Sequence, residues 1–583
     1  MYLKYPALFL FIIISITSFA QPGSNFTDPN AAQKRWVDSV FRKLNRKEKV
    51  AQMFFLRAHT DKGKAYEDAV AKVIKRNKVG GLVFFQGGPG RQAALTNVYQ
   101  EISDIPLLIA MDAEWGLGMR LDSTISYPYQ MTLGAIQDTN LIYQMGQMIA
   151  GDFKRLGMHI NFAPVVDVNN NPDNPVINYR SFGDNKYNVA AKASEYMRGL
   201  QDEGILVSIK HFPGHGDTNV DSHSDLPVLP FTKERLDSLE LYPFKQLIKQ
   251  GASGVMVAHM SIPSLDNTPH LPSTLSKAIV TGLLKEKLGF KGLIFSDAME
   301  MKGVVKYFPD GEADVRAVIA GNDIIELSED APRAIRLVRK AIRSKRLSMD
   351  SINVSVKKIL AAKYWAGLNK DVKVNTQNVY EDLNGGNALA LNQRLSDAAV
   401  TVLISDSLLR QLDLTRRTAI ISLGVSEVST FQKEMQKHFN NSTNFILSKI
   451  ASAADIRNVT NELRNFDQII VAIHDYRKRP QSSLDYNSEL KSFITYLTKL
   501  NTVTSLFANP YTIRGLPGIE KSKSLLVNYQ NSDEMQVAAA KVLSNRMQAS
   551  GHLPVTVNAR FKTGDGIRFF PVPATVSGQV ERD

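Results

Sequence analysis

The chain has 583 residues, of which 44% are apolar and 22% charged, and these proportions are typical of folded globular proteins. Its length exceeds what one ordinary hydrophobic core accommodates, so two domains are expected. The lack of cysteine in the sequence excludes disulfides, thiolate metal sites, a cysteine nucleophile and a lipid-modified cysteine. The net charge of +13 comes from basic residues scattered among acidic ones, a pattern that argues against nucleic-acid binding.

Residues 1–20 have the pattern of a signal peptide. Lys4 precedes an apolar run over residues 7–16, and Ser18-Phe19-Ala20 supplies the small residues that signal peptidase requires. The run is too short to span a bilayer, so we expect export and cleavage without stable membrane insertion afterwards; a buried N-terminal helix is the alternative. An exported chain without disulfides fits the periplasm or surface of a bacterium better than a eukaryotic secretory route.

Strand-like and helical stretches alternate over residues 30–365. Continuous Val/Ile/Leu-rich strands separated by amphipathic helices indicate a parallel sheet that is buried on both faces. Eight such units predict a (β/α)8 barrel of the TIM type, with a doubly wound open sheet as the alternative. The strand-like runs are 50–56, 79–85, 106–112, 159–167, 206–212, 254–260, 292–297 and 323–327.

A second set of alternating stretches predicts a smaller doubly wound α/β sandwich domain over residues 390–565. A polar connector rich in Asn and Asp, residues 366–389, separates it from the barrel. Its expected strands are 399–404, 418–423, 444–447, 468–473, 502–507 and 524–528.

Polar residues cluster where the predicted barrel strands end. Barrel enzymes build their active sites at the face formed by the carboxyl ends of the strands, so these residues are expected to meet there. They are Asp112, Asp167, Lys210, His211, His259, Asp297 and Glu326.

The densest of these clusters is Lys210-His211-Phe212-Pro213-Gly214-His215-Gly216-Asp217-Thr218. Two glycines and a proline prevent a regular element from continuing, so the charged groups are expected on a loop. A loop with two histidines, a lysine and a carboxylate directly after a buried strand favours a catalytic acid or base over a structural role.

These motifs resemble glycoside hydrolase family 3, and within it the β-N-acetylhexosaminidase branch. The cluster over 210–218, followed by Asp221-Ser222-His223, matches the loop signature of that branch. Residues 294–301 are similar to the nucleophile strand of the family, residues 109–114 to its sugar-binding aspartate motif, and residues 180–183 to its sugar-binding arginine motif. The resemblance covers nearly the whole mature chain, as a barrel followed by an α/β sandwich.

The resemblance implies the catalytic roles. Asp297 corresponds to the nucleophile of a retaining glycosidase, and His215 to the acid/base, whose ordinary pKa of about 6.5 lies near working pH. Asp217 is expected to orient the His215 ring and to stabilise its protonated form. Asp221 and His223 are expected to anchor the loop. No metal or cofactor is implied.

The resemblance also implies the sugar-binding residues. Asp112 is expected to accept hydrogen bonds from sugar hydroxyls, while Arg180, Lys210 and His211 donate to sugar oxygens. A structural salt bridge between Asp112 and Arg180 is the alternative. The sequence departs from the common family form at Trp115, which is expected to shape a subsite for the next sugar.

The expected function is therefore an exported, retaining exo-β-N-acetylglucosaminidase that acts on a GlcNAc-containing glycan or muropeptide from peptidoglycan. A β-glucosidase and an N-acetylglucosamine phosphorylase are alternatives of the same fold. A metal-dependent hydrolase that uses His211, His215, Asp217, Asp221 and His223 as ligands is an alternative of another class. A non-catalytic protein that binds the cell wall is a further alternative. Some relatives carry an additional serine-hydrolase domain, so this sequence is either a shorter natural protein or a fragment.

Overall fold

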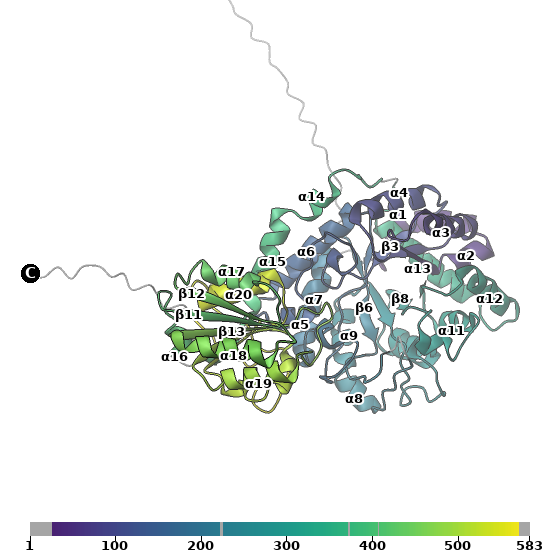
Figure 1. Ribbon diagram of the computed structural model, residues 1–583. Coiled ribbons are helices and arrows are strands. Elements are labelled where there is room, and N and C mark those ends of the chain that lie inside the picture. The colour runs from purple at the N-terminus through teal and green to yellow at the C-terminus, as the bar shows by residue number, and fades with distance from the viewer. Residues whose placement is uncertain (1–25, 222–224, 371–372, 406, 571–583) are drawn as a thin grey trace, which may run out of the picture.

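The computed structural model describes residues 26–221, 225–370, 373–405 and 407–570 (Figure 1). The expected signal peptide and the residues Ser222 and His223 lie outside this part of the chain. In Figure 1 a purple-to-teal α/β unit lies beside a green-to-yellow unit that contains one open sheet. Within the described ranges no helix combines the length and apolar character needed to cross a membrane.

The first unit is a barrel of parallel strands. Its sheets have the orders β5-β4-β3-β2-β1-β9 and β6-β7-β8. Isolated bridges between Phe295 and Ile324 and between Val165 and Lys210 close the ring, and β5 and β6 both belong to the predicted run 206–212. The strands are β1 (Phe54–Ala58), β2 (Gly81–Phe84), β3 (Leu108–Met111), β4 (Ile160–Asn161), β5 (Leu206–Val207), β6 (Ile209–Phe212), β7 (Gly254–Val257), β8 (Leu293–Ser296) and β9 (Ile325–Glu326). The structure confirms the predicted barrel.

Helices surround these strands. The helices of the barrel unit are α1 (Ala31–Lys43), α2 (Arg46–Ala51), α3 (Lys64–Asn77), α4 (Pro89–Glu101), η1 (Leu117–Met119), α5 (Gln130–Ala135), α6 (Asn140–Arg155), η2 (Asn178–Arg180), α7 (Lys186–Asp202), α8 (Lys233–Ser238), α9 (Leu241–Lys249), η3 (Ser273–Leu275), η4 (Ala278–Lys287, a π-helix), α10 (Lys302–Val305), α11 (Glu312–Ala320), α12 (Ala331–Arg343) and α13 (Met349–Trp365).

The first barrel strand begins later than predicted, because a short helix occupies the start of the predicted run 50–56. Val50 and Ala51 belong to α2, and β1 begins only at Phe54. A capping box between Asn45 and Glu48 starts this helix, and its two last residues are buried. A buried helical turn followed by a buried strand forms one apolar run, which periodicity alone does not divide.

Aromatic rings fill the interior of the barrel. The ring of Phe295 on β8 lies 6.5 Å from that of Phe55 on β1 and 5.5 Å from that of Phe162, which follows β4. Side chains two residues apart on a strand point to the same face, so Asp297 lies on the inner face directly above Phe295. The packed interior thereby places Asp297 at the mouth of the barrel.

The second unit is a six-stranded sheet of order β10-β15-β14-β13-β11-β12 with helices on its faces. All pairs are parallel except β10 with β15, which is antiparallel. The structure confirms the predicted doubly wound sandwich and adds the antiparallel edge. The strands are β10 (Thr401–Ser405), β11 (Thr418–Leu423), β12 (Ser442–Leu447), β13 (Gln468–His474), β14 (Thr502–Phe507) and β15 (Ser524–Val527). Helix α14 (Val379–Leu383) lies in the connector and packs against α4 and α6 of the barrel unit. The helices of the second unit are α15 (Gly386–Ala399), α16 (Ser407–Arg410), α17 (Thr430–Gln436), α18 (Ala453–Glu462), η5 (Leu463–Asn465), α19 (Ser488–Leu497), η6 (Pro510–Gly515), η7 (Ile519–Lys521) and α20 (Asp533–Leu543).

The two units meet along the segment that joins β4 to α7, which carries Arg180. Asn509 donates from Nδ2 to Oδ1 of Asn178 at 2.6 Å, and Asn169 donates to the hydroxyl of Tyr511 at 3.1 Å. Helix α15 packs against α5 and α6. The second unit therefore supports one of the segments that form the mouth of the barrel.

Candidate active site

Two carboxylates and three cations form a charged cluster at the barrel mouth. Lys210 contacts Asp112 at 2.7 Å and Glu114 at 2.8 Å through Nζ, and its side chain is only 2% exposed. Arg120 donates to Asp112 at 2.6 Å, and Arg180 binds Glu114 through two hydrogen bonds of 2.9 and 2.6 Å. The alternative in which Arg180 pairs with Asp112 is wrong, because Glu114 occupies the guanidinium.

The cluster stays ionised over a wide pH range. Burial by itself disfavours the carboxylates of Asp112 and Glu114, but the neighbouring cations outweigh burial and lower both pKa values, that of Glu114 to about 2. Burial also disfavours the cationic forms of Lys210 and Arg180, yet the carboxylates raise the pKa of each. The mouth of the barrel thus presents fixed hydrogen-bond acceptors and donors side by side.

Asp167 anchors the loop that carries both histidines. Its carboxylate is completely buried and contacts Nδ1 of His211 at 2.7 Å. It also accepts hydrogen bonds from the backbone N–H groups of His211 at 3.1 Å and of His215 at 2.7 Å. Burial disfavours the carboxylate, but His211 and these donors lower its pKa below the ordinary value. His211 also lies 3.4 Å from Arg180, so the loop adjoins the charged cluster.

His215 is buried in the same loop. Its Nδ1 shares a hydrogen bond of 2.7 Å with the hydroxyl of Thr218, and its carbonyl accepts one of 2.9 Å from Asn174. Burial and the neighbouring His211 lower its pKa to about 4, although the carboxylates of Asp167 and Asp297 oppose this shift. His215 follows β6 and Asp297 follows β8, so these two predicted catalytic residues lie at the same end of the barrel.

Asp217 has a different partner from the predicted one. Its carboxylate pairs with Arg235 on α8 at 3.2 Å, and Arg235 also contacts Glu240 at 2.9 Å. In this conformation the predicted pair between Asp217 and His215 is not formed, because a guanidinium neutralises the carboxylate and Thr218 binds the ring nitrogen. No sequence signal places Arg235, on the next helix, beside this loop.

Asp297 directly follows β8, and Glu326 is the last residue of the neighbouring strand β9. Oδ1 of Asp297 accepts a hydrogen bond of 2.8 Å from the N–H of Ala298, and the side chain is half-buried. Glu326 is 3% exposed, and burial together with the charges of Asp112 and Asp297 raises its pKa well above the ordinary value. The sequence places Glu326 at a strand end but gives no role for it.

Three aromatic rings border the charged cluster. Trp115 lies 4.9 Å from Tyr129 and 6.2 Å from Tyr179, measured between ring centroids. The hydroxyl of Tyr129 donates to the carbonyl of Lys478 in the second unit at 3.0 Å. Trp115, where the sequence departs from the common form of the family, therefore lies in an aromatic surface beside Glu114 and Arg180.

The described residues contain no group of three or more His, Asp or Glu side chains arranged to hold a metal ion. Three of the residues that a metal-dependent hydrolase would use as ligands contact other groups. His211 contacts Asp167, His215 contacts Thr218, and Asp217 pairs with Arg235. His223 lies outside the described residues.

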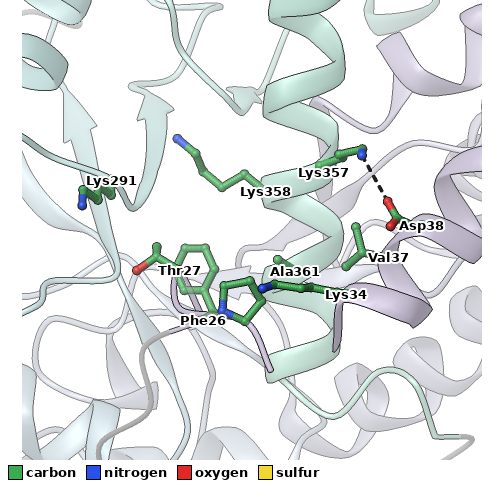
Figure 2. A pocket seen from close by; sticks show the side chains of 10 residues that line it. Phe26, Thr27, Lys34, Val37, Asp38, Lys291, Lys357, Lys358 and Ala361 are labelled. Atoms are coloured by element: carbon green, nitrogen blue, oxygen red, sulfur yellow. Dashed lines mark hydrogen bonds and ion pairs between the residues drawn. The ribbon is translucent and has the colours of Figure 1, made fainter. Parts of the chain in front are cut away.

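A cavity of about 420 Å³ lies at the other end of the barrel (Figure 2). Lys291, which lines it, precedes β8, and Lys358 donates to the carbonyl of Gly292 at 2.9 Å. The cavity is therefore separate from the carboxyl ends of the strands, where the predicted site residues meet.

Comparisons with known proteins agree with the fold. Residues 46–362 match the glycosyl hydrolase family 3 N terminal domain. The chain is 28% identical over 550 residues to beta-hexosaminidase A of Pseudoalteromonas piscicida, covering 84% of this chain and 91% of that protein. It is 34% identical over 283 residues to beta-hexosaminidase LpqI of Mycobacterium tuberculosis, covering 46% and 71%. The structure of a family 3 beta-N-acetylglucosaminidase from Paenibacillus sp. str. FPU-7 superposes with a TM-score of 0.75 and 30% identity, covering 88% of this chain and 99% of that chain.

The chain belongs to glycoside hydrolase family 3, in its β-N-acetylhexosaminidase branch. This confirms the resemblance drawn from the loop over residues 210–218, and it makes the protein a carbohydrate-active hydrolase.

Proposed function

We propose that this hydrolase is an exported, retaining exo-β-N-acetylglucosaminidase that removes terminal β-linked N-acetylglucosamine, with peptidoglycan fragments as its natural substrates. The observation that carries the proposal is that a half-buried carboxylate, Asp297, and a buried imidazole, His215, follow β8 and β6 of one parallel sheet at the mouth of the barrel. The names of the relatives, two beta-hexosaminidases and a beta-N-acetylglucosaminidase, support an acetamido sugar as the substrate.

The reaction takes two displacements in this proposal. Asp297 attacks the anomeric carbon while His215 gives a proton to the departing oxygen, and an ester between Asp297 and the sugar results. Water then attacks the same carbon, His215 takes a proton from the water, and Asp297 leaves as a carboxylate. Each displacement inverts the anomeric centre, so the product keeps the β configuration.

His215 must hold a proton in the first step, although its pKa in the present loop conformation is about 4. We assign the stabilisation of the imidazolium to Asp217. A shift of the loop that replaces Arg235 by His215 as the partner of Asp217 places a carboxylate against the ring, which raises the pKa of His215. The half-exposed position of the present partner, Arg235, favours such an exchange, because ion pairs of this kind contribute little stability.

The charged cluster holds the sugar in this proposal. Asp112 accepts hydrogen bonds from hydroxyls, whereas Arg180, Lys210 and His211 donate to sugar oxygens. The fixed ionisation of Asp112 supports this role, because the acceptor is present without reorganisation. The rings of Trp115 and Tyr179 lie beside this cluster and offer an apolar surface for the next sugar.

A comparison of two substrates tests the proposal. Release of p-nitrophenol from its β-N-acetylglucosaminide and from its β-glucoside is measured for the wild type, Asp297→Ala and His215→Ala, with and without EDTA and phosphate. We expect cleavage of the acetamido substrate alone, unaffected by EDTA, and a loss of at least about 10³-fold in Asp297→Ala. Acceleration by phosphate would indicate a phosphorylase, sensitivity to EDTA a metal-dependent hydrolase, and saccharide binding without turnover a wall-binding protein.

Export is tested separately. We expect the mature protein from the native host to begin at Gln21 and to appear in the envelope or secreted fraction. N-terminal sequencing of the fractionated protein measures both, and a cytoplasmic protein that retains residues 1–20 would contradict export.

A further inference from the structure

Glu326 is a buried carboxyl group beside the proposed nucleophile. Its side chain is 3% exposed, and Oε1 has no hydrogen-bond partner among the described residues. Its backbone is fixed on both sides, since its N–H donates to the hydroxyl of Ser296 at 2.9 Å and its carbonyl accepts from the N–H of Met299 at 3.0 Å. A buried polar atom without a partner is costly, so its presence next to a reaction centre calls for a functional explanation.

The strand register places Glu326 next to Asp297. Phe295 on β8 and Ile324 just before β9 are bridge partners in parallel strands, so their side chains lie on the same face. Two residues further along, Asp297 and Glu326 again lie side by side on that face. The same face carries the aromatic rings of the barrel interior, so both carboxyl groups point into the mouth.

The cations of the mouth are already engaged by other carboxylates. Lys210 binds Asp112 and Glu114, Arg120 binds Asp112, and Arg180 binds Glu114. None of the ion pairs within the described ranges includes Glu326. Burial, Asp112 and Asp297 together raise its pKa, and the more distant attraction of Lys210 opposes them only in part. The surroundings therefore favour the neutral form of the carboxyl group.

The other elements packed against β9 do not supply a charge that changes this. Strand β1 carries Arg57, whose guanidinium pairs with Glu300. Helix α11 carries Glu312 and Arg316, which pair with each other, and the buried Asp314, whose own pKa burial raises to about 7. The charged groups that act on Glu326 are thus Asp112, Asp297 and Lys210.

We propose that Glu326 is a positioning residue that works as a neutral carboxylic acid beside Asp297, and that loss of its proton ends activity on the alkaline side. The inference rests on the proposed role of Asp297 as nucleophile. The neutral acid keeps a single negative charge at the reaction centre and offers an O–H donor to Asp297 or to a sugar hydroxyl. An ionised Glu326 repels Asp297 and draws Lys210 away from Asp112, which dismantles the cluster that holds the sugar.

The test compares pH profiles of kcat/KM on p-nitrophenyl β-N-acetylglucosaminide for the wild type, Glu326→Gln and Glu329→Gln. Glutamine keeps the shape of the side chain and stays neutral at every pH. We expect the alkaline limb of Glu326→Gln, relative to its own plateau, to move up by about one pH unit or more. Glu329 is an exposed carboxylate three residues further on, and its replacement by Gln makes the same change in charge. We expect it to leave the limb in place.

His215 must also be protonated, so an alkaline limb of Glu326→Gln that coincides with that of the wild type would assign this limb to His215 and overturn the inference that Glu326 sets it. Carbon-13 NMR of protein labelled at the Glu carboxyl carbons measures the protonation state directly. We expect one resonance of the wild type to have the chemical shift of a neutral acid at pH 7. This resonance should be missing from the spectrum of Glu326→Gln. If this variant does not fold, Glu326→Leu assigns the resonance instead. Full ionisation of all Glu carboxyls at pH 7 would also overturn the inference. A wild type without turnover, or an active Asp297→Ala, instead contradicts the proposed function.

Discussion

Asp167 shows how one buried carboxylate shapes the site at the scale of a residue. It has no exposed surface, and the ring of His211 and the backbone N–H groups of His211 and His215 all donate to it or contact it. It therefore fixes the tautomer of His211 and the position of His215 at the same time. The sequence places Asp167 at a strand end, but only the structure assigns it this anchoring role.

We expect Asp167→Asn to lower the free energy of unfolding by about 3 kcal/mol at pH 7, because it removes the carboxylate that binds the His211 ring and two backbone N–H groups. The folded state lowers the pKa of Asp167, so the carboxylate contributes stability that is present above its unfolded pKa and is lost as pH falls through the folded value. Chemical denaturation at several pH values measures this: the difference from the wild type should shrink below about pH 4. A difference that is the same at pH 3 and pH 7 would contradict the anchoring role.

At the scale of an element, the loop after β6 combines predictable and unpredictable features. The positions of Lys210 and of the glycines can be predicted from the local sequence, since an apolar run followed by Gly and Pro indicates a strand and then a loop. The partners that hold the loop are distant: Asn174 contacts His215 from 41 residues away, and Arg235 lies 18 residues beyond Asp217. The spacing of residues predicts which side chains lie at a strand end. It does not predict which side chains contact them, because tertiary packing decides those contacts.

Gly216 is the tightest point of this loop. A Cβ atom at this position would lie 1.8 Å from the carbonyl oxygen of Val168. We expect Gly216→Ala to displace the loop that carries His215 and to lower kcat/KM by about 10²-fold, since small misplacements of a catalytic group are costly.

Gly151→Ala is the matched control, because Gly151 lies in α6 and a Cβ there meets nothing within 4 Å. We expect it to leave kcat/KM unchanged and to raise the free energy of unfolding by up to about 1 kcal/mol. Steady-state kinetics together with thermal unfolding compare the two variants. An active Gly216→Ala would show that the loop tolerates a shift at this point.

At the scale of the whole molecule, the second unit supports the mouth of the barrel through a relay of side chains. Tyr511 accepts a hydrogen bond from Asn169, and the segment that contains Asn169 also supplies Asn174 to His215 and carries Arg180. The alternation of strands and helices predicts the two units separately. It does not predict this contact, because the residues involved are more than 300 positions apart along the chain.

We expect Tyr511→Phe to lower kcat/KM by about 3- to 10-fold, because loss of the hydroxyl removes the hydrogen bond that ties Asn169 to the second unit and loosens the segment next to His215. Tyr529→Phe is the matched control, since its hydroxyl contacts Thr401 within the second unit. We expect both variants to lose about 1 kcal/mol of stability and only the first to lose activity. Equal kinetics for the two variants would contradict the supporting role.

The central claim is that Asp297 forms a covalent bond to the sugar, and trapping that intermediate tests it most directly. The enzyme is incubated with an activated N-acetylglucosaminide that carries a fluorine at C5, a substitution that slows breakdown of the ester, and its peptides are then analysed by mass spectrometry. We predict one added sugar on the peptide that contains Asp297, and none on the corresponding peptide of Asp297→Ala. Turnover without any labelled peptide, or a label on another residue such as Glu326, would contradict the account.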